Sequence, residues 1–239
     1  MTFIPVRSVI DKQLFEHVYQ PLWNLMNWSI FGYESLLRVN GVKNIEQFFQ
    51  KAREEGCCLY ELDLISLESS ISQFPFLEQK RGLLFVNVYP STISRREFAQ
   101  LLKKMVERFP YIKNRIVFEL NETTEDDDRW KDGELKAAVQ WIREHGFYIA
   151  VDDVGKGAST LQKIIELQPD YIKLDRYFAQ GLAVNVEKQR MLSLLVNYCS
   201  PKIVLVLEGI EKEVDLAQAK LLRVPAAQGY LLGRPERLT

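Results

Sequence analysis

The sequence predicts an α/β fold in which strand and helix units alternate around a parallel sheet. Short runs rich in Val, Ile, Leu, Phe and Tyr alternate with longer amphipathic stretches, which is the pattern of crossover units in such a sheet. The length of 239 residues matches one closed barrel of about 250 residues. No Pro-, Gly- or Ser-rich linker divides the chain, so we expect residues 1–239 to form a single domain.

The first third of the chain predicts three strands and two helices. Runs of β-branched and aromatic residues indicate the strands, and apolar residues at helical spacing indicate the helices. The expected strands are Phe3–Val9, Val18–Trp23 and Phe31–Val39, and the expected helices are Ile45–Ala52 and Leu59–Ile71.

The rest of the chain predicts strands separated by crossover helices. One helix is expected to begin at Ser94, because Ser-Arg-Arg-Glu forms a capping box before apolar residues at helical spacing. Two further helices are expected at Glu134–Glu144, closed by Gly146, and at Ser159–Leu167, closed by Pro169. The expected strands are Leu83–Val88, Arg115–Leu120, Phe147–Asp153, Tyr171–Asp175, Ile203–Glu208 and Gln228–Leu232.

Composition excludes several classes of protein. Apolar residues make up 47% and charged residues 26%, as in ordinary globular proteins. The 31 basic and 32 acidic residues leave a net charge of −1, which argues against binding a nucleic-acid polymer or an anionic membrane by net charge. The longest aliphatic run, Ile203–Leu207, is far shorter than the roughly 20 residues that span a bilayer, and the N-terminus has no secretory pattern. We therefore expect a cytoplasmic protein without a membrane span.

The cysteines and histidines do not form a recognisable site. Cys57, Cys58 and Cys199 are odd in number and lack zinc spacing, so we expect reduced structural thiols. His17 and His145 do not form an HExxH pattern. A metal in this protein would therefore have to be held by oxygen ligands.

Polar or ionisable side chains stand at the carboxyl ends of five successive predicted strands. They are Asn87, Glu119, Asp152 with Asp153, Lys173 with Asp175, and Glu208. A single acidic residue at such a position is commonly a turn or cap residue. Five in register indicate a shared site, because parallel strands end on one face and crowded carboxylates repel unless cations neutralise them. Oxygen ligands favour Mg²⁺ or Mn²⁺, and the pair Asp152 and Asp153 suits a two-metal hydrolytic centre.

Ordered motifs across the chain resemble those of the EAL-domain phosphodiesterases of bacterial cyclic di-GMP signalling. They are YQP (Tyr19–Pro21), GYESLLR (Gly32–Arg38), FVNV (Phe85–Val88), FELNE (Phe118–Glu122), DDVGKGAST (Asp152–Thr160), DYIKLD (Asp170–Asp175), EGIE (Glu208–Glu211) and QGYLLGRP (Gln228–Pro235). The second is similar to the signature GxEALLR. The resemblance implies a TIM-like (β/α)8 barrel with an antiparallel first strand, and hydrolysis of cyclic di-GMP to linear 5′-pGpG with two Mg²⁺ or Mn²⁺ ions.

The resemblance also implies a role for individual positions. The implied metal ligands are Glu34, Asn87, Glu119, Asp152, Asp153 and Glu208. The implied catalytic residues are Lys173 and Gln228 near the attacking water, and Glu211, which would hold the loop after Asp153. Arg38 would grip a phosphate, and Gln20 would contact the substrate.

Other roles stay open for two of these residues. Lys173 could be a surface lysine on a strand, and Arg38 could pair with Asp63 or Glu61. If Lys173 lies near metals, burial would lower its pKa and allow it to act as a base, but orienting the attacking water is the simpler role.

Some positions depart from the family pattern. Ser35 replaces the Ala of the signature, and Val154, Lys156 and Ala158 stand where the family usually has Phe, Thr and Tyr. By family analogy this loop couples dimerisation to the aspartates, so a homodimer is expected and its coupling to activity is in question. The start of the motifs near the N-terminus predicts no preceding sensor domain, so regulation would involve signalling partner proteins or control of expression.

Two functional hypotheses follow from these motifs. The intact ligand set favours a cyclic di-GMP phosphodiesterase. The altered loop favours the alternative, a catalytically silent cyclic di-GMP receptor that acts through a protein partner.

Overall fold

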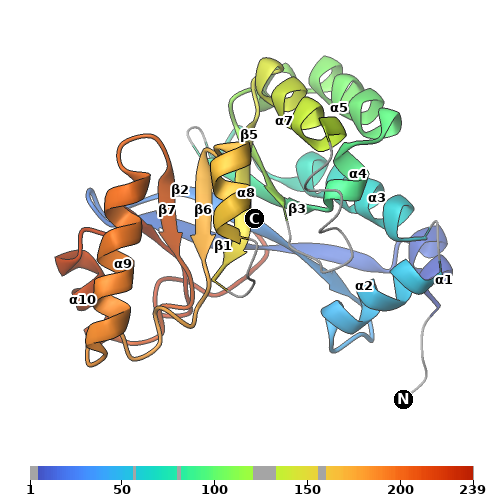
Figure 1. The fold of residues 1–239 in the computed structure, drawn as a ribbon. Helices are drawn as coiled ribbons and strands as arrows, with labels where there is room; N and C mark the ends of the chain where they lie inside the picture. The colour runs from blue at the N-terminus through green and yellow to red at the C-terminus, as the bar shows by residue number, and fades with distance from the viewer. Residues whose placement is uncertain (1–4, 56–57, 80–81, 121–132, 156–159, 239) are drawn as a thin grey trace.

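Eight strands close into a barrel in the computed structural model of the protein, which describes residues 5–55, 58–79, 82–120, 133–155 and 160–238 (Figure 1). The strands are neighbours in the order of the sequence. The first, β1 (Phe15–Asn24), runs antiparallel to both β2 (Ser29–Val39) and β8 (Ala226–Ala227), and all other neighbouring strands are parallel. The expected TIM-like barrel with an antiparallel first strand is therefore confirmed.

The remaining elements alternate around this barrel. The strands are β3 (Leu83–Val88), β4 (Ile116–Leu120), β5 (Tyr148–Val154), β6 (Tyr171–Leu174) and β7 (Val204–Leu207). The helices are α1 (Val6–Lys12), α2 (Ile45–Glu54), α3 (Cys58–Gln73), α4 (Pro90–Ile93), α5 (Arg96–Arg108), the 3₁₀ helix η1 (Pro110–Ile112), α7 (Gly133–Glu144), α8 (Thr160–Leu167), α9 (Val186–Cys199) and α10 (Glu213–Leu221).

Most predicted elements are present with nearly the predicted ends. β3 has the predicted bounds, and the ends of β4 to β7 differ from prediction by at most one residue. Helices α9 and α10 were not predicted. In α9 the apolar residues Met191, Leu194 and Tyr198 are exposed, which obscures the periodicity that normally reveals a helix.

Two predicted strands are wrong. Phe3–Val9 was expected to be a strand, but the chain is helical from Val6. Val6, Val9 and Ile10 are buried at helical spacing. A segment with only four apolar residues is too short for their spacing to distinguish a helix from a strand.

The last strand is shorter and lies earlier than the expected Gln228–Leu232. Strand β8 is Ala226–Ala227, and a turn follows in which the N–H groups of Leu232 and Gly233 donate to the Gly229 carbonyl. The backbone of Ile210 packs directly against Gly229, and this contact ends the strand.

The capping box at Ser94 is also wrong. Ser94 ends the short helix α4, where its Oγ donates to the Pro90 carbonyl at 3.2 Å. Helix α5 begins at Arg96 without a side-chain cap.

The barrel interior has an apolar layer and a polar layer. The apolar layer consists of Leu22, Phe85, Val117, Ala150, Val206 and Ala226. Side chains two positions apart on a strand point to the same side. The residues two positions away are Gln20, Asn87, Glu119, Asp152, Glu208 and Gln228. One periodicity therefore places the apolar floor and the polar groups above it on the same strands.

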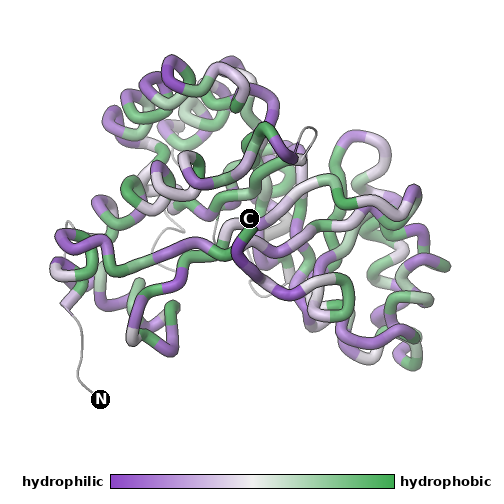
Figure 2. The backbone as a smooth tube through the Cα atoms, turned by 180° about the vertical axis from the view of Figure 1, so that it is seen from behind, coloured by the Kyte–Doolittle hydropathy of each residue, from purple (hydrophilic) through white to green (hydrophobic). Residues whose placement is uncertain are grey.

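The hairpin of β1 and β2 extends beyond the barrel towards α1, α2 and α3 (Figure 1). β2 pairs with β3 only from Gly32 to Ser35, although its pairing with β1 continues to Val39. A second hydrophobic core, which includes Val9, Leu37 and Phe48, packs the hairpin against these helices. Figure 2 shows hydrophilic and hydrophobic residues alternating along the elements, as expected for elements with one buried face.

Among the residues described, none of the helices has both the length and the apolar character needed to cross a bilayer.

Candidate active site

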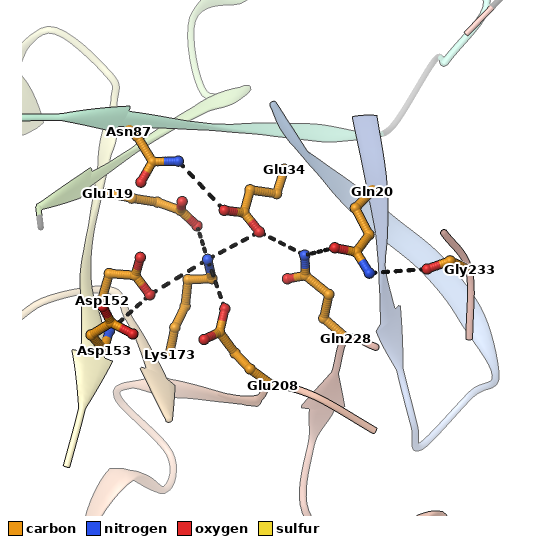
Figure 3. A network of polar contacts seen from close by, with 10 residues as sticks. All are labelled: Gln20, Glu34, Asn87, Glu119, Asp152, Asp153, Lys173, Glu208, Gln228 and Gly233. Atoms are coloured by element: carbon orange, nitrogen blue, oxygen red, sulfur yellow. Dashed lines mark hydrogen bonds and ion pairs between the residues drawn. The ribbon is translucent and has the colours of Figure 1, made fainter. Parts of the chain in front are cut away.

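A ring of carboxylates surrounds the ammonium group of Lys173 inside the barrel (Figure 3). The Nζ atom lies 2.9 Å from Glu208 Oε1, 3.0 Å from Glu119 Oε1, 3.2 Å from Glu34 Oε2 and 3.5 Å from Asp152 Oδ1. The side chain of Lys173 is 1% exposed. The alternative that Lys173 is a surface lysine is therefore wrong.

Amide groups fix the orientation of Glu34. Gln228 Nε2 donates to Glu34 Oε2 at 2.6 Å, and Asn87 Nδ2 donates to Glu34 Oε1 at 3.4 Å. Gln228 Nε2 also donates to Gln20 Oε1 at 2.9 Å, and Gln20 in turn donates to the Gly233 carbonyl at 3.0 Å. Gln20 therefore supports Gln228 from behind (Figure 3).

Three carboxylates at the ends of β5 and β7 form the tightest acidic cluster. Asp152, Asp153 and Glu208 each offer an oxygen, and these atoms lie within 4.8 Å of one another. Asp153 has a left-handed backbone with φ of 54°, which is uncommon for a residue other than glycine. At this point the pairing of β5 with β6 is irregular, so consecutive aspartates both reach the same site (Figure 3).

The pKa values reflect the crowding of buried charge. Burial raises the pKa of Glu119 well above its usual range and that of Glu208 to about 8, and Lys173 only partly opposes this. The pKa of Asp152 is raised for the same reasons. Burial would also raise the pKa of Glu34, but Lys173 and the amide of Gln228 outweigh it and lower that pKa.

The neighbouring carboxylates keep Lys173 charged. Burial lowers the pKa of a lysine, but Asp152, Glu119, Glu208 and Glu34 together raise that of Lys173 well above its usual value. Burial lowers the pKa of Lys173 as expected, but the four carboxylates outweigh it. The expected fall of this pKa beside bound metal ions stays a prediction.

The donor set fits hard divalent cations. The carboxylates of Glu34, Glu119, Asp152 and Glu208 share one ammonium group, so full ionisation leaves an excess of negative charge at this centre. Glu119 Oε2 is buried, and no hydrogen-bond partner for it lies among the described residues. Carboxylate and amide oxygens are the ligands that Mg²⁺, Mn²⁺ and Ca²⁺ prefer.

A cavity of about 560 Å³ opens beside the carboxylates, between β2, β3, α2 and α3. Glu34, Asn87, Asp152 and Asp153 line its barrel side. Arg38 also lines it, is exposed, and donates to its neighbouring Leu37 carbonyl at 3.0 Å. The cavity therefore joins the acidic centre to a cationic side chain.

The structure brings together the six implied metal ligands with Lys173 and Gln228 (Figure 3). Gln20 lies behind Gln228, and substrate contact by Gln20 stays a prediction. Glu211 is exposed just after β7, and its expected partner, the loop at 156–159, lies outside the described residues. Its positioning role therefore also stays a prediction.

The structure also gives the contacts of Asp175 and of the two acidic residues that were expected to pair with Arg38. Asp175 serves the turn after β6, where its Oδ1 accepts the N–H of Tyr177 at 2.9 Å. Glu61 pairs with Arg7 rather than Arg38, and Asp63 accepts the N–H of Tyr89 at 3.0 Å.

Sequence reasoning missed several residues that line the cavity. His17 is 4% exposed, with Nε2 3.1 Å from Ser66 Oγ. Arg53 lies 5.4 Å from the centre of the Tyr89 ring. Only a family alignment or the fold could have revealed these residues, because they come from separate elements and form no local motif.

Fold and site together define a barrel protein with an acidic, oxygen-lined centre at the strand ends. The chain belongs to the EAL domain family, whose pattern matches residues 6–235. RocR of Pseudomonas aeruginosa, named a cyclic di-GMP phosphodiesterase, is 28% identical over 248 residues, which cover 95% of this chain and 58% of RocR. PdeI of Escherichia coli, named a probable cyclic di-GMP phosphodiesterase, is 26% identical over 228 residues, which cover 91% of this chain and 28% of PdeI. The chain thus spans only part of the length of these relatives.

Solved structures support the same fold. The EAL domain of FimX from Pseudomonas aeruginosa, bound to c-di-GMP, aligns with a TM-score of 0.84 at 21% identity and covers 98% of this chain and 95% of that one. An EAL domain protein from Listeria monocytogenes aligns with a TM-score of 0.81 at 22% identity and covers 99% of this chain and 96% of that one.

Proposed function

We propose that the protein is a metal-dependent phosphodiesterase that opens cyclic di-GMP to linear 5′-pGpG. The observation that carries the proposal is the buried ring of carboxylates beside an open cavity lined by Arg38. The names of RocR and PdeI support the same substrate. The implied ligands are Glu34, Asn87, Glu119, Asp152, Asp153 and Glu208, for two Mg²⁺ or Mn²⁺ ions.

The chain's own residues would bind the phosphate and orient the attacking water. Hard divalent ions, when bound, supply a Lewis acid for the phosphate and make water a stronger nucleophile. The Arg38 guanidinium would hold a phosphate oxygen. Lys173 would donate a hydrogen bond to the attacking water. Gln228 Oε1 is buried and has no hydrogen-bond partner within the described part of the chain, so it would accept one from the same water.

The decisive experiment separates binding from cleavage by choice of metal. The protein should bind cyclic di-GMP in EDTA or Ca²⁺ and should cleave it only with Mg²⁺ or Mn²⁺, because Ca²⁺ tolerates looser geometry than in-line attack requires. Binding is measured by calorimetry and 5′-pGpG by chromatography. If nucleotide binds with Mn²⁺ and no 5′-pGpG forms, the enzyme proposal fails and the receptor hypothesis replaces it.

A homodimer through α8 and α9 is part of the proposal. Ile165 on α8 is exposed, and α9 carries an exposed apolar stripe of Met191, Leu194 and Tyr198. Exposed apolar surface of this kind commonly marks a protein interface. Such an interface would lie close to β5, which carries the two aspartates.

A further inference from the structure

The loop between β6 and α9, residues 175–185, packs against the ends of the two strands that carry the acidic cluster. We call it the brace loop. The N–H of its first residue, Asp175, donates to the Val154 carbonyl of β5 at 3.1 Å, and the N–H of Glu208 in turn donates to Leu174 of β6 at 3.0 Å. The brace loop therefore begins between the carboxyl ends of β5 and β7.

The brace loop packs closely against two glycines that lie next to the acidic cluster of Asp152, Asp153 and Glu208. Gly155 lies two residues after Asp153, and a Cβ atom there would lie 2.5 Å from the ring of Phe178. Gly209 directly follows Glu208, and a Cβ atom there would overlap the side chain of Arg176. Both glycines have positive φ, so only glycine allows the loop to sit this close without strain.

The brace loop is itself anchored to the following helices. The carboxylate of Asp215 on α10 is buried and accepts the N–H groups of Ala183 at 2.8 Å and Gly181 at 3.2 Å. Lys188 on α9 donates to the Gln180 carbonyl at 2.8 Å. Because these hydrogen bonds anchor the brace loop, the loop can in turn hold Gly155 and Gly209 in place.

Asp153 needs such support. Its left-handed backbone (φ 54°) is unfavourable for an L-residue and persists only where the surroundings over-determine it. This conformation lets Asp152 and Asp153 both present oxygens to the cluster with Glu208. The aromatic ring of Phe178 lies against Gly155, two residues after Asp153.

We propose that Phe178 is a positioning residue that holds Asp153 in its left-handed conformation, so that the cluster of Asp152, Asp153 and Glu208 binds a divalent cation. The proposal rests on the proposed function, because it concerns the same metal centre. Phe178 belongs neither to the acidic cluster nor to the lining of the cavity and acts through Gly155.

The test measures Mn²⁺ affinity of the full chain by electron paramagnetic resonance without nucleotide. The ring of Phe178 is replaced by progressively smaller side chains in Phe178→Leu, Phe178→Val and Phe178→Ala. The affinity for Mn²⁺ should fall along this series, by about tenfold or more for Phe178→Ala. Phe109→Ala is the matched control, because Phe109 is also a partly buried phenylalanine but follows α5, away from the cluster.

The outcomes separate this proposal from the proposed function. Phe178→Ala and Phe109→Ala should both lower the melting temperature, but only Phe178→Ala should weaken Mn²⁺ binding. If Phe178→Ala does not fold, the Leu and Val variants carry the comparison. A wild-type protein that binds no Mn²⁺ overturns the metal-dependent function. If the wild type binds Mn²⁺ and the Phe178 variants bind it with the same affinity, only the positioning role of Phe178 is overturned.

Discussion

Lys173 Nζ lies 3.0 Å from Oε1 of Glu119, and these two side chains are 1% and 0% exposed. The ammonium group lies within 3.5 Å of four carboxylates, which enclose it. Its position at the centre of the ring (Figure 3) suits a donor that orients water during the reaction.

Lys173→Ala should therefore lower kcat far more than it weakens cyclic di-GMP binding. A contact made mainly in the transition state affects kcat, and loss of one such donor costs about 10²-fold. Steady-state kinetics with Mn²⁺ and calorimetry with Ca²⁺ give the two quantities. Lys104→Ala, an exposed lysine on α5, should match the wild type. Equal losses in kcat and in binding would contradict the assigned role.

Asp152→Asn and Glu34→Ala should abolish detectable hydrolysis while the fold stays intact. Asp152→Asn replaces a charged carboxylate by a neutral amide, and Glu34→Ala removes a carboxylate altogether, while both leave the apolar floor of the barrel unchanged. In EDTA the melting temperature of Asp152→Asn should equal or exceed that of the wild type, because one of several crowded charges is removed. Glu187→Gln on α9, whose side chain is 80% exposed, is the control. Wild-type turnover in either variant would exclude the metal site.

Arg38→Lys should weaken cyclic di-GMP binding by about tenfold with a smaller change in kcat. Lysine keeps the charge but lacks the planar fork that holds a phosphate with two hydrogen bonds. Calorimetry in Ca²⁺ measures the affinity without turnover. Unchanged affinity would show that Arg38 does not bind the substrate.

His17 should make the free energy of unfolding depend on pH. Burial lowers its pKa from 6.5 to about 4, so the unfolded chain binds the proton more tightly. The contribution of neutral His17 is complete above pH 6.5 and is lost as pH falls towards 4, by about 2 kcal/mol between pH 7 and pH 5.

Urea unfolding of the wild type and His17→Gln at these two pH values checks this prediction. Contributions from carboxylates are common to both proteins and cancel in the comparison. The variant should lose less stability than the wild type on acidification. Identical losses would show that His17 is not held neutral in the folded protein.

Leu194→Glu should convert the expected dimer into a monomer without unfolding it. Leu194 is 66% exposed in the middle of the α9 stripe, and a buried charge there would be costly at an interface. Sedimentation at tens of micromolar gives the oligomeric state. Leu221→Glu is the matched control, since Leu221 is 76% exposed on α10. A wild-type monomer with full activity would exclude both the dimer and its control of catalysis.

The strand-end residues were predictable because their signal is local. Asn87, Glu119, Asp152 and Glu208 each follow an apolar run, and parallel strands necessarily end on one face. Glu34 has no such signal, because it lies inside a strand among apolar residues, and only the family resemblance indicated it. The turn at Gln228 was mistaken for a strand because its apolar residues follow the same short pattern.

The sequence by itself indicated the alternation of strands and helices, the polar residues at the strand ends and, through its motifs, the family, because hydrophobic periodicity and residue chemistry are properties of neighbouring residues. Only the tertiary structure decided that Lys173 lies at the centre of the carboxylates and that His17 and Tyr89 line the cavity. It also decided that Asp153 is left-handed and that Gly155 lies against the ring of Phe178. These features depend on barrel closure, which brings together side chains that are far apart in the chain and whose contacts no local pattern encodes.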